Sequence, residues 1–188
     1  MASTTTTAAA TSTTPPASTA PVAKPPASTT GAKAQSEPTF GQIALTSPAF
    51  KAGGPIAARY TCDGANVSPP LRWHGVPAGT AELFLLAVAV GGAGETVQWA
   101  LAGIPPSAKR IPEGSLPAGA IAGLNSAGKV GWGGVCGPKG SVQRVVFVLY
   151  ALSRKLSLKD GFDPVSIRNG LKSVSVARGL TLATYTRA

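Results

Sequence analysis

Leu83-Phe-Leu-Leu-Ala-Val-Ala-Val90 and Val97-Gln-Trp-Ala-Leu-Ala-Gly-Ile104 are two short apolar runs, separated by a segment that contains Gly91-Gly-Ala-Gly94. Apolar runs of this length, bounded by glycine and proline, are typical of buried strands. The glycine-rich connection leads into a strand and not into a helix, so no helix N-terminus is available there to bind a phosphate. The two runs therefore predict a fold that is built on buried β-strands.

Further strands are predicted on both sides of these runs. Phe40–Leu45 alternates weakly and predicts a first strand, Arg144–Leu152 is another apolar run, and Leu180–Thr186 alternates. The chain also contains 23 glycines and 17 prolines, a composition that favours strands joined by loops over long helices. The expected fold class is mainly β.

One segment near the C-terminus predicts a helix. Asp163 can accept backbone N–H bonds as an N-cap, and Pro164 suits the first helical position, where no donor is needed. Apolar residues then follow at a spacing of four and three: Ile167, Leu171 and Val174. Gly179 is the expected stop. We expect this helix to pack as a lid on a sheet.

Residues 1–38 differ in composition from the rest of the chain. They are almost entirely Ala, Thr, Ser and Pro, and such a segment cannot bury enough apolar surface to offset its ordering entropy. We therefore predict a disordered tail over residues 1–38 and a folded domain over residues 39–188. The tail is either a spacer between an anchor and an extracellular domain or a segment without a function of its own.

The compartment is not fixed by the sequence. Residues 1–38 contain neither the basic start nor the apolar region of a secretory signal, and the longest apolar run, Leu83–Val90, is too short to span a bilayer. We expect an extracytoplasmic protein if an upstream signal was removed, and a cytoplasmic one otherwise.

The chain is strongly basic, with a formal net charge of +10 at pH 7. Such a surplus is compatible with nucleic acid or an anionic membrane as a partner. However, the basic residues are spread along the domain without a run longer than two, and aromatic residues are not interleaved with them. We therefore predict a generally basic surface and no nucleic-acid site.

A search for catalytic residues finds no complete set. The chain has a single histidine, His74, next to Gly75 in a turn-forming segment, where an exposed turn residue is the simplest interpretation. The acids form no close pair, and no nucleophile elbow or phosphate-binding loop is present. One histidine and two distant cysteines cannot complete a tetrahedral metal shell. We predict no enzyme activity, no metal and no cofactor.

The two cysteines, Cys62 and Cys136, are too far apart in sequence for a redox CxxC motif. Each is followed by turn-forming residues, so each is expected in a loop, and the two loops could meet. In an exported domain such a pair would commonly form a disulfide, whereas in the cytosol it would stay reduced. We favour the disulfide.

Several segments together resemble one known family. The segments, in chain order, are Leu45-Thr-Ser-Pro-Ala-Phe50, Gly54-Pro-Ile-Ala-Ala-Arg-Tyr-Thr-Cys-Asp-Gly64, Asn66-Val-Ser-Pro-Pro-Leu-Arg-Trp73, Gly103-Ile-Pro-Pro106, Pro112-Glu-Gly114, Gly128-Lys-Val-Gly-Trp-Gly-Gly134 and Ala183-Thr-Tyr-Thr-Arg187. Residues 40–188 are in this respect similar to the phosphatidylethanolamine-binding protein family, in its bacterial and archaeal branch, often called Raf-kinase-inhibitor-like. The resemblance implies a two-sheet antiparallel β-sandwich with a C-terminal helix.

The resemblance also implies a small anion pocket at one end of the sandwich. In the family it is built from an Asp-Pro-Asp-Xaa-Pro segment, a histidine before an aromatic residue, a Gly-Pro-Xaa-Pro loop and a His-Arg pair. The corresponding positions here are Val88 at the start of the first segment, Gln98 for the histidine, Pro138 in the loop, and Gln143-Arg144 for the pair. Asp63 and Ser68 still match the family pattern.

These differences change what the pocket can bind. A buried anion needs charge-assisted hydrogen bonds, and an amide in place of an imidazole offers donors and acceptors without charge. The sequence therefore predicts a non-catalytic binding or interaction module. Its pocket is either adapted to a small neutral ligand or vestigial, and its partner is that ligand or a protein. An alternative is a kinase or protease inhibitor that acts through surface loops, as relatives in this family do.

Overall fold

The computed structural model describes residues 40–92 and 94–187, so the predicted tail, residues 1–38, lies outside the described residues together with residue 39. The described chain forms nine strands, one 3₁₀ turn and one α-helix. In chain order they are β1 (Gly41–Gln42), β2 (Ala44–Thr46), η1 (Ala58–Tyr60), β3 (Leu71–His74), β4 (Glu82–Gly91), β5 (Gly94–Ile104), β6 (Arg110–Ile111), β7 (Ile121–Ala122), β8 (Val142–Leu152), α1 (Pro164–Val174) and β9 (Ser175–Thr186).

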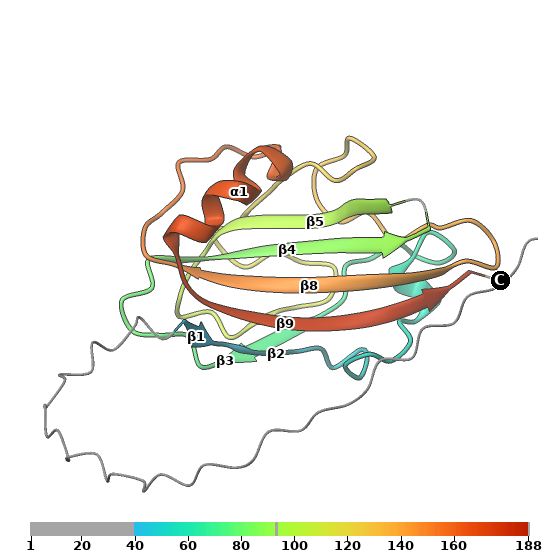
Figure 1. Cartoon of the computed structure of the whole chain (residues 1–188), viewed down its shortest axis with the longest axis horizontal. Coiled ribbons are helices and arrows are strands. Elements are labelled where there is room, and N and C mark those ends of the chain that lie inside the picture. Colours follow the sequence, from blue (N-terminus) through green and yellow to red (C-terminus); the bar gives the residue numbers. More distant parts are fainter. Residues whose placement is uncertain (1–39, 93, 188) are drawn as a thin grey trace, which may run out of the picture. The chain divides into compact units, whose positions relative to one another are not determined.

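Two sheets form a sandwich, which confirms the predicted fold class. The larger sheet has the order β1-β9-β8-β4-β5-β7 and the smaller one β2-β3-β6. Neighbouring strands are antiparallel except for β1 and β9, which are parallel. The four long strands β5, β4, β8 and β9 lie side by side, and β2 and β3 of the smaller sheet appear below β9 in this view (Figure 1).

The core lies between the two sheets because the strands alternate in the residues that they bury. On β8 the side chains of Val145, Phe147 and Leu149 face this core, where Phe147 stacks on Phe50 with ring centroids 5.5 Å apart. Trp73 on β3 contributes from the smaller sheet. The apolar runs that predicted buried strands form β4 and β5, the pair of neighbouring strands in the larger sheet.

The helix α1 covers the outer face of the larger sheet. Its predicted start is confirmed, since the Asp163 carboxylate accepts hydrogen bonds from the N–H groups of Val165 and Ser166 at 3.0 and 3.2 Å. Leu171 and Val174 then pack into a second apolar cluster formed with side chains of β4 and β5. The helix thus buries the outer side of these strands, which accounts for their almost continuous hydrophobicity.

The predicted stop of the helix at Gly179 is wrong. The helix ends at Val174, and β9 begins at the next residue, so Gly179 lies within a strand. Gly179 allows the backbone at Ile43 to approach β9 closely, because a Cβ on Gly179 would lie 2.4 Å from the carbonyl oxygen of Ile43. The glycine therefore lets another segment pass directly against β9.

The predicted first strand over Phe40–Leu45 is also corrected, because the segment belongs to both sheets. Gly41 pairs with Ala177 in the larger sheet, whereas Leu45 pairs with Trp73 in the smaller one. The change of sheet occurs at Ile43, whose N–H still donates to the carbonyl of Arg178 at 2.9 Å. Burial alternates through the crossing, since Ile43 and Leu45 are buried and Ala44 between them is exposed.

No helix within residues 40–92 and 94–187 combines the length and the apolar character needed to cross a membrane.

Candidate functional site

A cavity of about 240 Å³ opens at one end of the sandwich. It lies where β5 and β8 begin, on either side of the end of β4, at the right-hand end of the large sheet in Figure 1. Two loops, residues 125–127 and 133–136, complete its wall. Of the residues predicted for the family pocket, Gln98 and Gln143 both line this cavity. Each is only 7% exposed.

Gln98 reaches the cavity because β5 contains an irregularity at this position. Ala87 pairs with Trp99 and Val88 pairs with Val97, so Gln98 is an extra residue opposite β4. A bulge of this kind re-aims a side chain and often occurs beside functional sites. Here it lets Gln98 line the pocket while Trp99, the next residue, enters the inner core.

Gln143 comes from β8 and lies against two glycines. A Cβ on Gly91 would lie 2.2 Å from Gln143 Oε1, and a Cβ on Gly137 would lie 2.6 Å from Gln143 Nε2. The amide nitrogen also donates to Ser141 Oγ at 3.4 Å. The backbone at the end of β4 and the loop before β8 therefore leave a slot that fits the glutamine side chain.

The loop wall is fixed by buried polar contacts. Asn125 is 5% exposed, and its Oδ1 accepts the N–H groups of Ala127 and Lys129 at 2.9 and 3.2 Å. Its Nδ2 donates to the carbonyl of Gly131 at 3.1 Å. Because all these bonds lie within the loop, we interpret Asn125 as a residue that shapes the wall. Sequence reasoning missed it, since a turn-forming Asn-Ser pair indicates a loop but not its place in the fold.

The second loop is joined to the segment after η1. The Sγ atoms of Cys62 and Cys136 lie 2.05 Å apart, at bonding distance, as the sequence led us to favour. The Cys62 N–H donates to the carbonyl of Val135 at 3.3 Å, and the Gly134 N–H donates to Asn66 Oδ1 at 2.6 Å. Cys136 itself lines the cavity. The cysteine pair thus ties one wall of the pocket to the neighbouring loop.

Asp63 lies beside this wall but does not line the cavity. Its carboxylate accepts hydrogen bonds from the hydroxyl of Tyr185 and from Arg187 Nε, the latter at 3.1 Å. These two partners hold the pKa of Asp63 below its ordinary value, with the Tyr185 hydrogen bond as the larger cause. Arg187 also donates to the carbonyl of Gly137 at 3.1 Å. Asp63 therefore secures the C-terminal segment against the loop that supports Gln143.

Besides Asp63, three predicted pocket residues do not enter the cavity. Val88 is corrected: it is buried with Phe84 and Leu86 in the cluster beneath α1, on the opposite face of the sheet. Arg144 is exposed, and the alternation of β8 places it on the face opposite to Gln143. Pro138 is exposed in its loop and acts only indirectly, because its carbonyl accepts the Ser141 hydroxyl at 2.6 Å.

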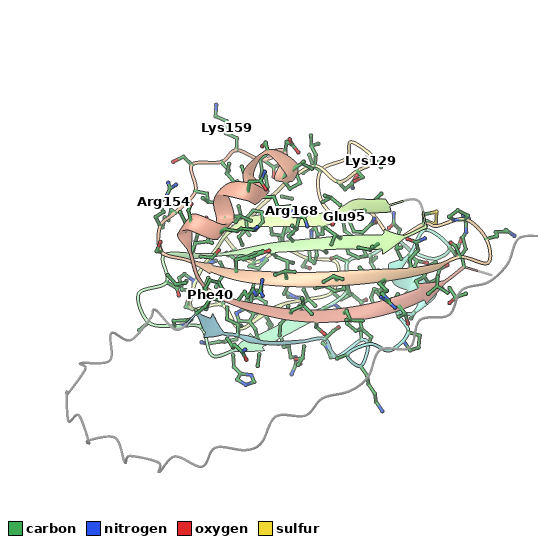
Figure 2. The ribbon with its side chains drawn as sticks, viewed as in Figure 1. Phe40, Glu95, Lys129, Arg154, Lys159 and Arg168 are labelled. Carbon is green, nitrogen blue, oxygen red and sulfur yellow. A yellow bond between two sulfur atoms is a disulfide. The ribbon has the colours of Figure 1, made fainter. Side chains whose placement is uncertain are left out.

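The cavity wall has no acidic or basic side chain among the residues that line it. Basic side chains lie elsewhere on the described surface: Lys129 follows β7, while Arg154 and Lys159 lie in the segment between β8 and α1 (Figure 2). Arg168 of α1 forms a salt bridge with Glu95 of β5. His74 is exposed at the end of β3, as predicted. The pocket therefore contains polar side chains but no charged one.

Comparison with known proteins agrees with the resemblance seen in the sequence. Residues 46–186 match the family model described as phosphatidylethanolamine-binding protein. The chain is 34% identical over 149 residues to a UPF0098 protein of Methanothermobacter thermautotrophicus, which covers 76% of this chain and 98% of that protein. It is 35% identical over 147 residues to LppC of Mycobacterium tuberculosis, whose name assigns it provisionally to the lipoproteins; this match covers 76% of this chain and 72% of LppC.

Two solved structures are similar as well. CT736 of Chlamydia trachomatis, described provisionally as a phosphatidylethanolamine-binding protein homologue, superposes with a TM-score of 0.72 at 29% identity. YbcL of Escherichia coli, described as a member of the mammalian family of that name, has the same TM-score of 0.72 at 25% identity. Each match covers 78% of this chain and 99% of the other.

Proposed function

The chain belongs to the phosphatidylethanolamine-binding protein family, and on that premise we propose that it is a non-catalytic binding module whose pocket takes a small uncharged polar ligand. The observation that carries the proposal is the pair of buried amides, Gln98 and Gln143, in a cavity without acidic or basic lining residues. These amides occupy the positions at which the family resemblance leads us to expect histidines.

Charge is the first argument against an anionic ligand. An anion in this cavity would lose its hydration and gain only neutral hydrogen bonds, worth about 1 kcal/mol each against about 1.5–3 kcal/mol for bonds to a charged group. Arg187, a cation beside the pocket wall, is already engaged by Asp63 and by the carbonyl of Gly137. It is therefore not free to replace the missing imidazoles.

Size and preorganisation support a specific ligand over a vestigial pocket. The cavity, about 240 Å³, is below the 300–1,000 Å³ range of drug-sized sites and suits a small molecule. The bulge at Gln98 and the glycine slot around Gln143 hold both amides in place. Side chains that are held in position by the neighbouring backbone are typical of a preorganised binding site.

A binding titration followed by ¹⁵N NMR tests this function. At equal concentration and constant ionic strength, we expect acetamide to shift the backbone amide resonances of Ser126 and Gly134 in the cavity wall, and inorganic phosphate and phosphoethanolamine to shift them less. Gln98→Leu or Gln143→Leu should abolish the shifts caused by acetamide, whereas Gln42→Leu, at an exposed site on β1, should not. Tighter binding of phosphate than of acetamide would contradict the proposal.

Two lines of support favour a location outside the cytoplasm. The cysteine pair at bonding distance is of a kind that persists in oxidising compartments, and the relative LppC carries a lipoprotein name. The alternative function, inhibition of a kinase or protease through surface loops, stays a prediction. Binding to an immobilised kinase or protease panel by a Gln98→Leu variant would favour it, since such inhibition needs no intact pocket.

A further inference from the structure

We propose that the pocket is an acceptor site: both buried amides turn their carbonyl oxygens to the cavity, so the ligand must be a small uncharged molecule that donates hydrogen bonds through N–H or O–H groups. This inference rests on the proposed function and narrows its ligand class. It follows from the direction of the hydrogen bonds that each glutamine makes with its neighbours.

The orientation of Gln143 is set by Ser141. The Ser141 hydroxyl donates its only hydrogen to the carbonyl of Pro138 at 2.6 Å. Its oxygen can therefore only accept a bond from the glutamine, and it does so from Gln143 Nε2 at 3.4 Å. The amide nitrogen must face Ser141, and the carbonyl oxygen of Gln143 points away from it.

The orientation of Gln98 is set in the same way by Thr96. Gln98 Nε2 lies 3.4 Å from the backbone carbonyl oxygen of Thr96 and 2.8 Å from Thr96 Oγ1. A carbonyl oxygen has no hydrogen to donate, so the group that faces it must be the amide nitrogen. Gln98 Oε1 is thereby left without a partner among the described residues, as is Gln143 Oε1.

Both unpartnered oxygens are accessible to solvent and belong to residues that line the cavity. Within the described chain, the buried side-chain polar atoms that lack a partner and are closed off from solvent are the indole nitrogens of Trp73 and Trp132. The two glutamine oxygens are not among them, and both residues line the cavity. An accessible acceptor without a protein donor can accept a hydrogen bond from a bound molecule, so a ligand with N–H or O–H groups suits this site. The hydroxyls of Thr96 and Ser126 also line the cavity and can rotate to suit either kind of group.

Gly91 leaves the space that the Gln143 amide occupies. The Gly91 backbone lies flat against the amide, and Gly91 does not have the left-handed φ that would require glycine for conformational reasons. Its missing side chain serves to make space, and any Cβ there must displace the glutamine. Gly92, the next residue, would carry a Cβ with nothing within 4 Å and offers a matched control.

The experiment compares acetamide with N,N-dimethylacetamide, which keeps the carbonyl but has no N–H donor. Backbone amide shifts of Ser126 and Gly134 in ¹⁵N-labelled protein report on binding at the wall. We expect acetamide to bind at least about tenfold more tightly, because a site built around buried polar groups rejects an analogue that leaves them unpaired. Equal binding of both fragments would leave the proposed function intact and overturn the acceptor assignment. Binding of neither would contradict the proposed function itself.

Variants test the positions of the acceptors. Gly91→Ala should move the side-chain amide resonance of Gln143 and lower acetamide affinity about tenfold, whereas Gly92→Ala should change neither. If Gly91→Ala does not fold, Gln143→Leu provides the same test by removing the acceptor. Unchanged acetamide affinity in Gln143→Leu would overturn the inference.

Discussion

Loss of the bond between Cys62 and Cys136 should destabilise the domain by about 2–4 kcal/mol. The two cysteines are 74 residues apart, and for a loop of that length the chain-entropy model gives an upper value of about 4.5 kcal/mol. The native loops are also held by the Cys62 N–H bond to Val135 and the Gly134 N–H bond to Asn66. Reduction should therefore act mainly by freeing the unfolded chain.

The assay is urea unfolding with and without a thiol reductant, with the Cys62→Ser/Cys136→Ser variant as the control. The variant should be as unstable as the reduced protein and should not respond to reductant. A thiol assay on denatured, unreduced protein should find no free thiol. Two free thiols per chain in protein made under oxidising conditions, or a stability difference below about 1 kcal/mol, would refute the reasoning.

Three further predictions concern a carboxyl group, a glycine and the tail. Burial raises the pKa of Glu82, so the carboxyl group keeps its proton to higher pH in the folded protein than in the unfolded chain. In the unfolded chain it titrates at about pH 4.3, and the free energy of unfolding should therefore fall as the pH rises above about 4.3. Glu82→Gln retains an acceptor for the backbone N–H of Leu156. It should remove this part of the pH dependence of stability in urea unfolding, and an unchanged pH dependence in the variant would count against the assignment to Glu82. Gly179→Ala should cost about 1–3 kcal/mol in urea unfolding through its contact with the carbonyl of Ile43, whereas Gly170→Ala, with open space around it in α1, should be neutral or stabilising. Removal of residues 1–38 should leave the unfolding midpoint unchanged, and a loss above about 1 kcal/mol would show that the tail packs on the domain.

The features that sequence could predict are those with a local signal. The N-cap at Asp163 and the apolar run at Leu83–Val90 each depend on residues that are close together in the chain, and both are confirmed. The end of the helix was missed because Gly179 serves a contact with Ile43, which is distant in sequence. No pattern near Gly179 reveals that contact.

The pocket was predicted only in part, because a local signal marks some of its residues and not others. Gln98 and Gln143 could be placed from the aromatic residue and the arginine that follow them, and the structure brings both to one cavity. Val88 was placed by counting back from Trp99, and such a count gives a position in the sequence but not the face of the strand. β4 pairs with β8 without a register shift, so its side chains alternate strictly and Val88 lies with Phe84 and Leu86 beneath α1.

A calorimetric titration with inorganic phosphate tests the central claim, the loss of charge from the pocket, most directly. The unaltered protein should bind phosphate no more tightly than about 1 mM, or about −4 kcal/mol. The Gln98→His/Gln143→His variant should bind it more tightly, most visibly below about pH 6.5, where imidazole is protonated. Micromolar binding of phosphate by the unaltered protein would contradict the account, because other groups would then have replaced the histidines.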